Sequence, residues 1–399
     1  MAKETAMESK TNTPTRASAR KAGVDRRTLL KSLGAVAGAA AVVAKTTGAN
    51  AGNAWTIASG MPDAKMVEIY TNMVKSRWWE EAIKDAFIAG KDGLYGACHL
   101  YIGEEAVACG AIGALNETDY IASTHRGHGH LIAKGGDLDK MSAEMFMKET
   151  GYNFGYGGSM HLTDISKGIL GMNGIIGPQY LLAAGAAYSA KVRGTKQVAM
   201  AFGGDGSVNN GWYYSGLRNA KLYNLAFVAV IENNGYQISM PTERTNAVKD
   251  LAQIGAGLEI PFEIVDGNDA LAMYAVAKRA VDRAREGGGP SIIEAKTSRW
   301  YDHSGFAGAK VGVQGAFGLP YRSDREVRAS MANDPIVRLR SFLVSTGVLT
   351  DAAADKIVDD VKTKVAASLE FARKSPPTKG ERGVFNVFAQ GSVSASQFA

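Results

Sequence analysis

The sequence contains little cysteine and no long apolar run. Cys98 and Cys109 are the two cysteines among 399 residues, and they form no C-x-x-C pair. This excludes a disulfide-rich scaffold and a zinc site built from cysteines. No apolar segment reaches the roughly 18 residues that a membrane-spanning helix needs. We therefore expect no membrane span.

An excess of one charge sign is also missing from most of the chain. Residues 1–51 hold nine Lys or Arg and three Asp or Glu, which accounts for the whole net charge of +6. The remaining residues are balanced, so we expect no nucleic-acid binding. With 46% hydrophobic and 21% charged residues, the chain has a globular composition. Its length suits one large catalytic domain with appendages.

The first 51 residues have the three parts of an export signal. Arg26 and Arg27 precede a mild apolar stretch over 33–44, and the small residues 49–51 have the form of an A-x-A cleavage site. This segment resembles a twin-arginine (Tat) signal, which predicts a signal peptide over 1–51, a linker over 52–61 and a periplasmic location. The alternatives are a disordered basic tail with a chance arginine pair, and a cytoplasmic location if the leader is not used.

The rest of the chain alternates between apolar runs of strand length and helical patterns. This alternation predicts an α/β fold with an open, mostly parallel sheet flanked by helices, over a catalytic domain at 62–374 and before a tail at 375–399. Strands are expected at 197–202, 226–231, 263–265 and 291–295. Helices are expected at 66–89, 104–115, 142–150, 181–192, 210–223 and 270–286, with C-terminal helices at 324–332, 335–346 and 352–373.

Polar side chains follow two of these strands. Asp205 comes just after the first strand, and Asn234 follows the next one 29 residues later. The carboxyl ends of neighbouring parallel strands meet at one edge of a sheet, where open α/β folds bind ligands. Carboxylate and amide oxygens suit Mg²⁺, and the glycine-rich turn at 203–206 lets the backbone approach a phosphate group. The spacing therefore predicts a site for Mg²⁺ and a diphosphate.

Here the sequence resembles a known family. GDGSVNNG and IENNGY are similar to the thiamine diphosphate motif, and HLYIGEEA, STHRGHGH, GGSMHL, GMNGIIG and YDHS follow the order found in one subfamily. That subfamily is the alpha subunit of thiamine diphosphate-dependent 2-oxo acid dehydrogenases, including the acetoin dehydrogenase type. The resemblance covers residues 66–343. It implies a thiamine diphosphate-binding fold and the decarboxylation of a 2-oxo acid, pyruvate-like in kind, or the cleavage of acetoin. The acyl group would pass to lipoyl-lysine or another acceptor.

The resemblance also implies roles for individual positions. Asp205 and Asn234 would bind Mg²⁺ together with the backbone of Tyr236, and Gly206 and Ser207 would contact the diphosphate. Further cofactor contacts are implied for Tyr101 and Arg126 at the phosphates, for Gly174 and Ile176 under the two rings, and for His303.

All six histidines lie in these motif loops, at 99, 125, 128, 130, 161 and 303. His303 is the first choice for a catalytic residue, since an imidazole titrates near neutrality and can protonate or stabilise the oxygens of a substrate adduct. His128, beside Arg126, is the second choice. For His130 and His161 we expect structural hydrogen bonds.

Several positions depart from the family pattern. They are Asn210, Ser215, Ala226, the residues 179–181, and the loop 305–308, which lacks the usual acidic residue. The implied cofactor ligands are intact, so these departures bear on substrate choice and on partner contacts.

The chain lacks a recognisable pyrimidine-binding domain. In the family, the glutamate that activates thiamine comes from a beta subunit, so the resemblance implies a heterotetramer of two alpha and two beta chains, with a lipoyl acyltransferase as a further partner. One alternative is an exported, non-catalytic thiamine diphosphate-binding protein. Another keeps the chemistry but uses a periplasmic electron acceptor.

Overall fold

The computed structural model describes residues 60–90, 94, 97–304, 321–380 and 383. The predicted signal peptide, the linker up to residue 59, the loop 305–320 and most of the predicted tail lie outside the described residues.

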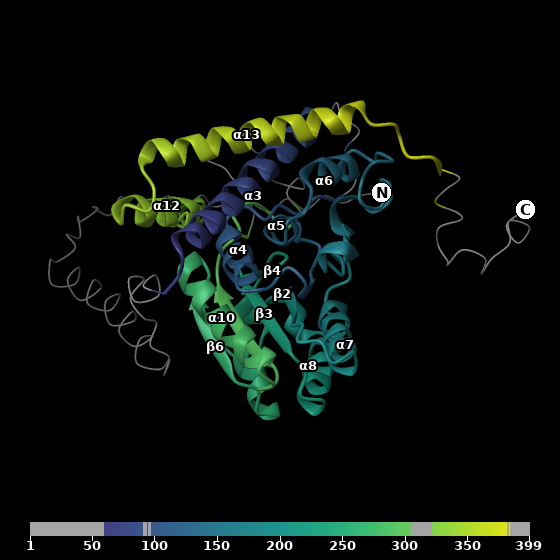
Figure 1. The fold of residues 1–399 in the computed structure, drawn as a ribbon, viewed down its shortest axis with the longest axis vertical. Helices are drawn as coiled ribbons and strands as arrows, with labels where there is room; N and C mark the ends of the chain where they lie inside the picture. The colour runs from purple at the N-terminus through teal and green to yellow at the C-terminus, as the bar shows by residue number, and fades with distance from the viewer. Residues whose placement is uncertain (1–59, 91–93, 95–96, 305–320, 381–382, 384–399) are drawn as a thin grey trace, which may run out of the picture. The chain divides into compact units, whose positions relative to one another are not determined.

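A parallel sheet of five strands forms the centre, in the order β1-β2-β3-β7-β6 (Figure 1). The strands are β1 (Tyr120–Ala122), β2 (Ala199–Gly204), β3 (Phe227–Asn233), β7 (Ser291–Lys296) and β6 (Phe262–Asp266). A separate antiparallel pair joins β4 (Tyr236–Gln237) to β5 (Met240–Pro241). The predicted α/β fold with a mostly parallel sheet is confirmed.

Alternate residues of the central strands face two different cores. In β2, Met200 and Phe202 pack into one apolar cluster, whereas Ala199 and Ala201 pack into the other. This period of two is the geometry of a strand buried on both faces, and it explains why these strands read as continuous apolar runs.

Helices cover both faces of the sheet (Figure 1). One face packs against α4 (Glu105–Gly113) and α10 (Ala270–Arg285), and the other against α7 (Pro178–Val192) and α8 (Gly211–Leu222). The long helix α3 (Asp63–Ala89) lies between α4 and the C-terminal helix α13 (Asp351–Lys374). Among the described residues, the other α-helices are α5 (His128–Ala133), α6 (Leu138–Met145), α9 (Thr242–Thr245), α11 (Asp324–Ala332) and α12 (Pro335–Ser345). The predicted C-terminal helices are confirmed.

One helix begins and ends earlier than expected. The sequence predicted a helix over 142–150, but α6 begins at Leu138, because the Asp137 side chain accepts hydrogen bonds from the first free backbone N–H groups. It ends before Met147, whose φ of 56° is left-handed. The short strand β1 and the β4–β5 pair were not predicted, since two or three residues carry no periodic signal.

Both cysteines are buried and free. Within the described ranges, no helix is both long and apolar enough to cross a membrane.

Candidate active site

The ends of β2 and β3 lie side by side, as the spacing predicted. Gly204 pairs with Glu232 in the sheet register, so Asp205 and Asn234 emerge at the same edge. A pocket opens there, and most of the predicted site residues line it: Arg126, Gly174, Ile176, Asp205, Gly206, Ser207, Asn234, Tyr236 and His303.

Asp205 is held in place by a neighbouring hydroxyl. The Oγ1 of Thr242, the first residue of α9, donates to Asp205 Oδ2 over 2.6 Å. The carboxyl group is 2% exposed, and burial raises its pKa, while the hydrogen bond from Thr242 opposes that rise. A divalent cation at this carboxylate would offset the cost of its burial, so the position fits a metal ligand.

Asn234 is oriented from both sides. Its Oδ1 accepts the backbone N–H of Tyr236 at 3.3 Å, and its Nδ2 donates to Glu104 Oε1 at 3.1 Å. The amide oxygen therefore lies on the side of the turn into β4, where the backbone of Tyr236 also borders the pocket. The three predicted metal ligands are brought together around one opening.

Gly206 packs closely against the side chain of Gln237 in the turn that follows β2. A Cβ placed on Gly206 would lie 2.7 Å from the side chain of Gln237, which also lines the pocket. The next residue, Ser207, donates its hydroxyl to Gly204 O at 2.6 Å and contacts Tyr180 Oη at 3.1 Å. The turn is therefore fixed by internal hydrogen bonds, and its backbone remains open to a ligand.

The Arg126 side chain contacts residues of two other loops. Its Nη1 donates to Leu100 O at 2.7 Å, and its Nη2 donates to His303 O at 2.8 Å. The Nε atom lies 3.6 Å from Glu104 Oε2. Arg126 is buried and lines the pocket, so its positive charge is available to an anionic group in this pocket.

His303 lines the pocket together with two histidines that the sequence analysis did not select, His99 and His125. Burial, followed by the charge of Arg126, lowers the pKa of His99 to about 2 and that of His303 to about 3. The same causes hold the pKa of His125 well below its usual range. All three imidazoles are therefore neutral at physiological pH in the ligand-free pocket.

Two predicted site residues lie outside the pocket lining. His128 is fully buried, with Nδ1 at 2.9 Å from Glu80 Oε1 and Nε2 at 3.0 Å from Ser159 O. Tyr101 is also fully buried, and its hydroxyl donates to Glu232. The polar atoms of both residues therefore have partners inside the protein, and their implied roles at the cofactor stay predictions.

Ile176 and Gly174 form part of the wall, as expected. The Ile176 carbonyl accepts a hydrogen bond from Asn210 Nδ2 at 3.0 Å. Asn210 is one of the departures from the family pattern, and its side-chain oxygen also accepts the N–H of Trp212 at the start of α8. This substitution is therefore built into the pocket wall. Ser215, another departure, is exposed on α8, and the loop 305–308 lies outside the described residues.

Two glutamates that the sequence analysis did not select also line the pocket. Glu232 accepts from the hydroxyl of Tyr101 and lies 3.1 Å from His130 Nε2. Glu104 is fully buried, and this burial raises its pKa to about 8, against the lowering effect of Arg126. Both stand in or beside motifs that the resemblance rests on, so the motif positions pointed to the right loops but not to these side chains.

Comparison with known proteins supports the reading of these motifs. The family model described as dehydrogenase E1 component matches residues 71–381. The alpha subunit of acetoin:2,6-dichlorophenolindophenol oxidoreductase from Bacillus subtilis is 40% identical over 332 residues, which are 82% of this chain and 95% of the relative. The subunit of the same name from Cupriavidus necator is 39% identical over 78% of this chain and 90% of its own length. The pyruvate dehydrogenase E1 component subunit alpha of Zymomonas mobilis is 37% identical over 81% of this chain and 88% of its own length.

Proposed function

Because this chain belongs to the family of dehydrogenase E1 components, we propose that it is the alpha subunit of a thiamine diphosphate- and Mg²⁺-dependent dehydrogenase acting on acetoin or a pyruvate-like 2-oxo acid. The observation that carries the proposal is the pocket at the ends of β2 and β3. It combines oxygen ligands for a hard cation with a buried arginine for an anion.

The donor set fits the cofactor. Asp205, Asn234 and the backbone of Tyr236 would hold Mg²⁺, and the turn at Gly206 and Ser207 would receive the diphosphate. The predicted Mg²⁺ ligands and Arg126 border the same pocket, so cation and diphosphate would neutralise each other there. Ile176 offers an apolar surface for the ring systems.

Thiamine diphosphate supplies a carbanion that adds to a carbonyl group and a ring that accepts the electrons released by bond cleavage. His303, neutral in the ligand-free pocket, would accept or return a proton at the oxygen of the bound substrate. Arg126 would hold His303 in place, because the Nη2 of Arg126 donates a hydrogen bond to the backbone carbonyl of His303.

A beta subunit completes the proposed unit, in a heterotetramer of two alpha and two beta chains. The glutamates of the described pocket are engaged elsewhere: Glu104 with Asn234, and Glu232 with Tyr101 and His130. The resemblance to the family implies that the activating glutamate comes from the beta subunit. A lipoyl acyltransferase is a further proposed partner, and a periplasmic electron acceptor is the alternative if the chain is exported.

Acetoin is the substrate that we place first. The two relatives at 40% and 39% identity carry acetoin and an artificial electron acceptor in their names, and the pyruvate dehydrogenase subunit follows at 37%. The difference is small, so acetoin and pyruvate should be assayed side by side with 2,6-dichlorophenolindophenol as acceptor.

Calorimetric titration of thiamine diphosphate with Mg²⁺ tests the proposal, using the chain with and without its beta subunit. We expect binding that appears or tightens with the partner, and that is lost in Asp205→Ala. Reduction of the acceptor dye in the presence of acetoin should require both subunits. Tight binding to the lone chain with no partner effect and no turnover would contradict the proposal and favour a non-catalytic binding protein.

A further inference from the structure

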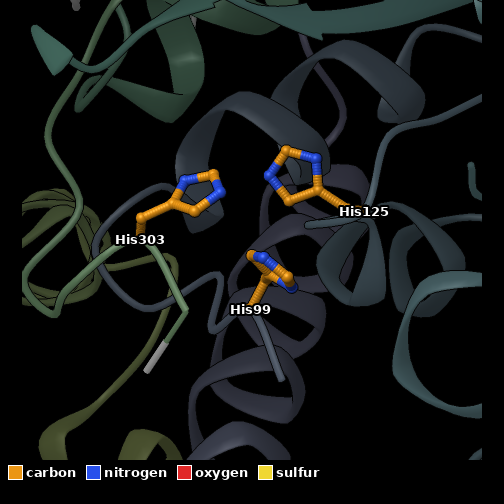
Figure 2. Close-up of side chains that lie close together, drawn as sticks. All are labelled: His99, His125 and His303. Carbon is orange, nitrogen blue, oxygen red and sulfur yellow. The ribbon is translucent and has the colours of Figure 1, made fainter. Parts of the chain in front are cut away.

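Three imidazoles converge in the pocket from three separate segments of the chain. His99 precedes α4, His125 follows β1, and His303 follows β7. Figure 2 shows the three rings facing one another across a small gap. Their ring centroids are 4.4 Å apart for His99 and His125, 4.9 Å for His99 and His303, and 5.0 Å for His125 and His303.

The ring nitrogens are close to the spacing of metal ligands. One nitrogen from each ring can be chosen so that all three lie within 4.8 Å of one another. Zinc–nitrogen bonds of 2.0–2.1 Å place the nitrogens of a tetrahedral site about 3.3 Å apart. Small rotations of the side chains would therefore bring them to bonding distance.

At least one nitrogen of the three histidines is free to bind a metal ion. The Nδ1 atom of His99, a residue 6% exposed, is buried and has no hydrogen-bond partner among the described residues. A buried polar atom without a partner carries an energetic cost that a bound ion would remove. The rings are neutral, so their lone pairs are available to a cation.

Two buried arginines supply the neighbouring positive charge, since the charges of Arg126 and Arg299 both lower the pKa values of the three imidazoles. Arg126 Nη2 lies 3.4 Å from His303 Nδ1, but its guanidinium donates to the carbonyls of Leu100 and His303, and its Nε lies 3.6 Å from the Glu104 carboxyl group.

From this geometry we propose that His99, His125 and His303 bind one transition-metal ion of the Zn²⁺ or Co²⁺ class in the cofactor-free chain. Three neutral nitrogens with an open fourth position suit such ions, whereas Mg²⁺ prefers oxygen ligands. The pocket thus holds two chemically distinct cation sites: nitrogen ligands at the three histidines, and oxygen ligands at Asp205 and Asn234.

Titration of the metal-free, full-length chain with Co²⁺ in the presence of excess Mg²⁺ tests this inference. We expect one Co²⁺ per chain, with the visible absorption of a tetrahedral nitrogen site, and displacement by Zn²⁺. His125→Ala and His303→Ala should each weaken binding by more than about tenfold, because each removes one of three metal–nitrogen bonds. Circular dichroism would verify that the variants fold.

His161→Ala is the matched control, since His161 is an exposed histidine outside the group, and it should leave Co²⁺ binding unchanged. Asp205→Ala should also retain it, because it removes an oxygen ligand alone. The inference would be overturned if Co²⁺ bound to several weak sites, or if His161→Ala weakened Co²⁺ binding as much as the other variants do. Loss of Co²⁺ binding in excess Mg²⁺ would also overturn it. It does not rest on the proposed activity: a chain that binds Co²⁺ but never thiamine diphosphate would contradict the proposed function alone.

Discussion

Glu104 lies between Asn234, which is a proposed Mg²⁺ ligand, and Arg126, which is the proposed contact of the diphosphate. Its Oε1 accepts from Asn234 Nδ2 at 3.1 Å, and its Oε2 lies 3.6 Å from Arg126 Nε. One buried carboxyl group therefore contacts both a predicted metal ligand and the arginine that we propose for the diphosphate. Its Oε2 atom has no hydrogen-bond partner among the described residues, so the group carries an unrelieved burial cost.

Glu104→Gln should change how stability depends on pH. Burial raises the pKa of Glu104 to about 8, above the ordinary value of 4.5 that applies in the unfolded chain. Between these two values the folded state holds a proton that the unfolded state has lost, so this group reduces stability progressively as the pH rises from 4.5 to about 8. Glutamine does not titrate. We therefore expect the melting temperature of the metal-free variant to rise relative to the wild type across this range, in thermal unfolding followed at several pH values. Parallel profiles for the two proteins would contradict this.

Thr242 positions Asp205, a predicted metal ligand, through one hydrogen bond. Thr242→Val removes the hydroxyl that donates to Asp205 Oδ2 but keeps the shape of the side chain. A lost hydrogen bond to a carboxylate costs about 1–2 kcal/mol, so Mg²⁺-dependent binding of thiamine diphosphate should weaken by roughly fivefold or more. Thr242→Ser, which retains the hydroxyl, should bind nearly as the wild type does. Calorimetry measures both, and equal affinities for valine and serine would show that the hydroxyl does not position Asp205.

The strands that carry the site were predictable because each is a short buried run. Continuous apolar residues in β2 and β3 indicated a parallel pair, and strand ends in such a pair must meet, which brought Asp205 and Asn234 together. The directions of loop side chains were not predictable. Tyr101 and His128 stand in motif loops, yet both point into the protein. His99 joins His125 and His303 through tertiary packing across three segments, which no spacing in the sequence reveals.

Replacing a glycine by alanine should have opposite effects on stability at two positions of the packed helices α7 and α8. A Cβ on Gly216 in α8 would lie 2.9 Å from the backbone of Tyr180, so helix packing requires the bare backbone. Gly185 in α7 has no atom within 4 Å of its Cβ position. Gly216→Ala should lower the free energy of unfolding by about 1–3 kcal/mol, and Gly185→Ala should raise it by about 0.5–1 kcal/mol. Chemical denaturation compares them, and a stabilising effect at Gly216 would contradict the close packing.

The whole chain divides by composition into a basic leader and a neutral body. Residues 1–51 account for the net charge of +6, whereas the body carries the parallel sheet, both of its apolar cores and the pocket. We propose that the leader directs export by the twin-arginine route, which carries folded proteins. A protein that binds a cofactor would gain from this route, because folding and cofactor loading are completed before transport.

Replacing Arg26 and Arg27 by lysine tests the proposed export of the chain by the twin-arginine route. The change keeps the charge of the leader, so a location that depends on charge alone would be unaffected, whereas recognition of the arginine pair would be lost. In a bacterium with a twin-arginine translocase, we expect the wild-type chain in the periplasmic fraction and the double variant in the cytoplasm. Lysine at Arg16 and Arg20, which lie upstream of the pair, is the matched control and should leave export intact. Equal periplasmic recovery of both double variants would exclude the twin-arginine route, whereas retention of the wild-type chain in the cytoplasm would place the proposed enzyme with the cytoplasmic lipoyl carriers.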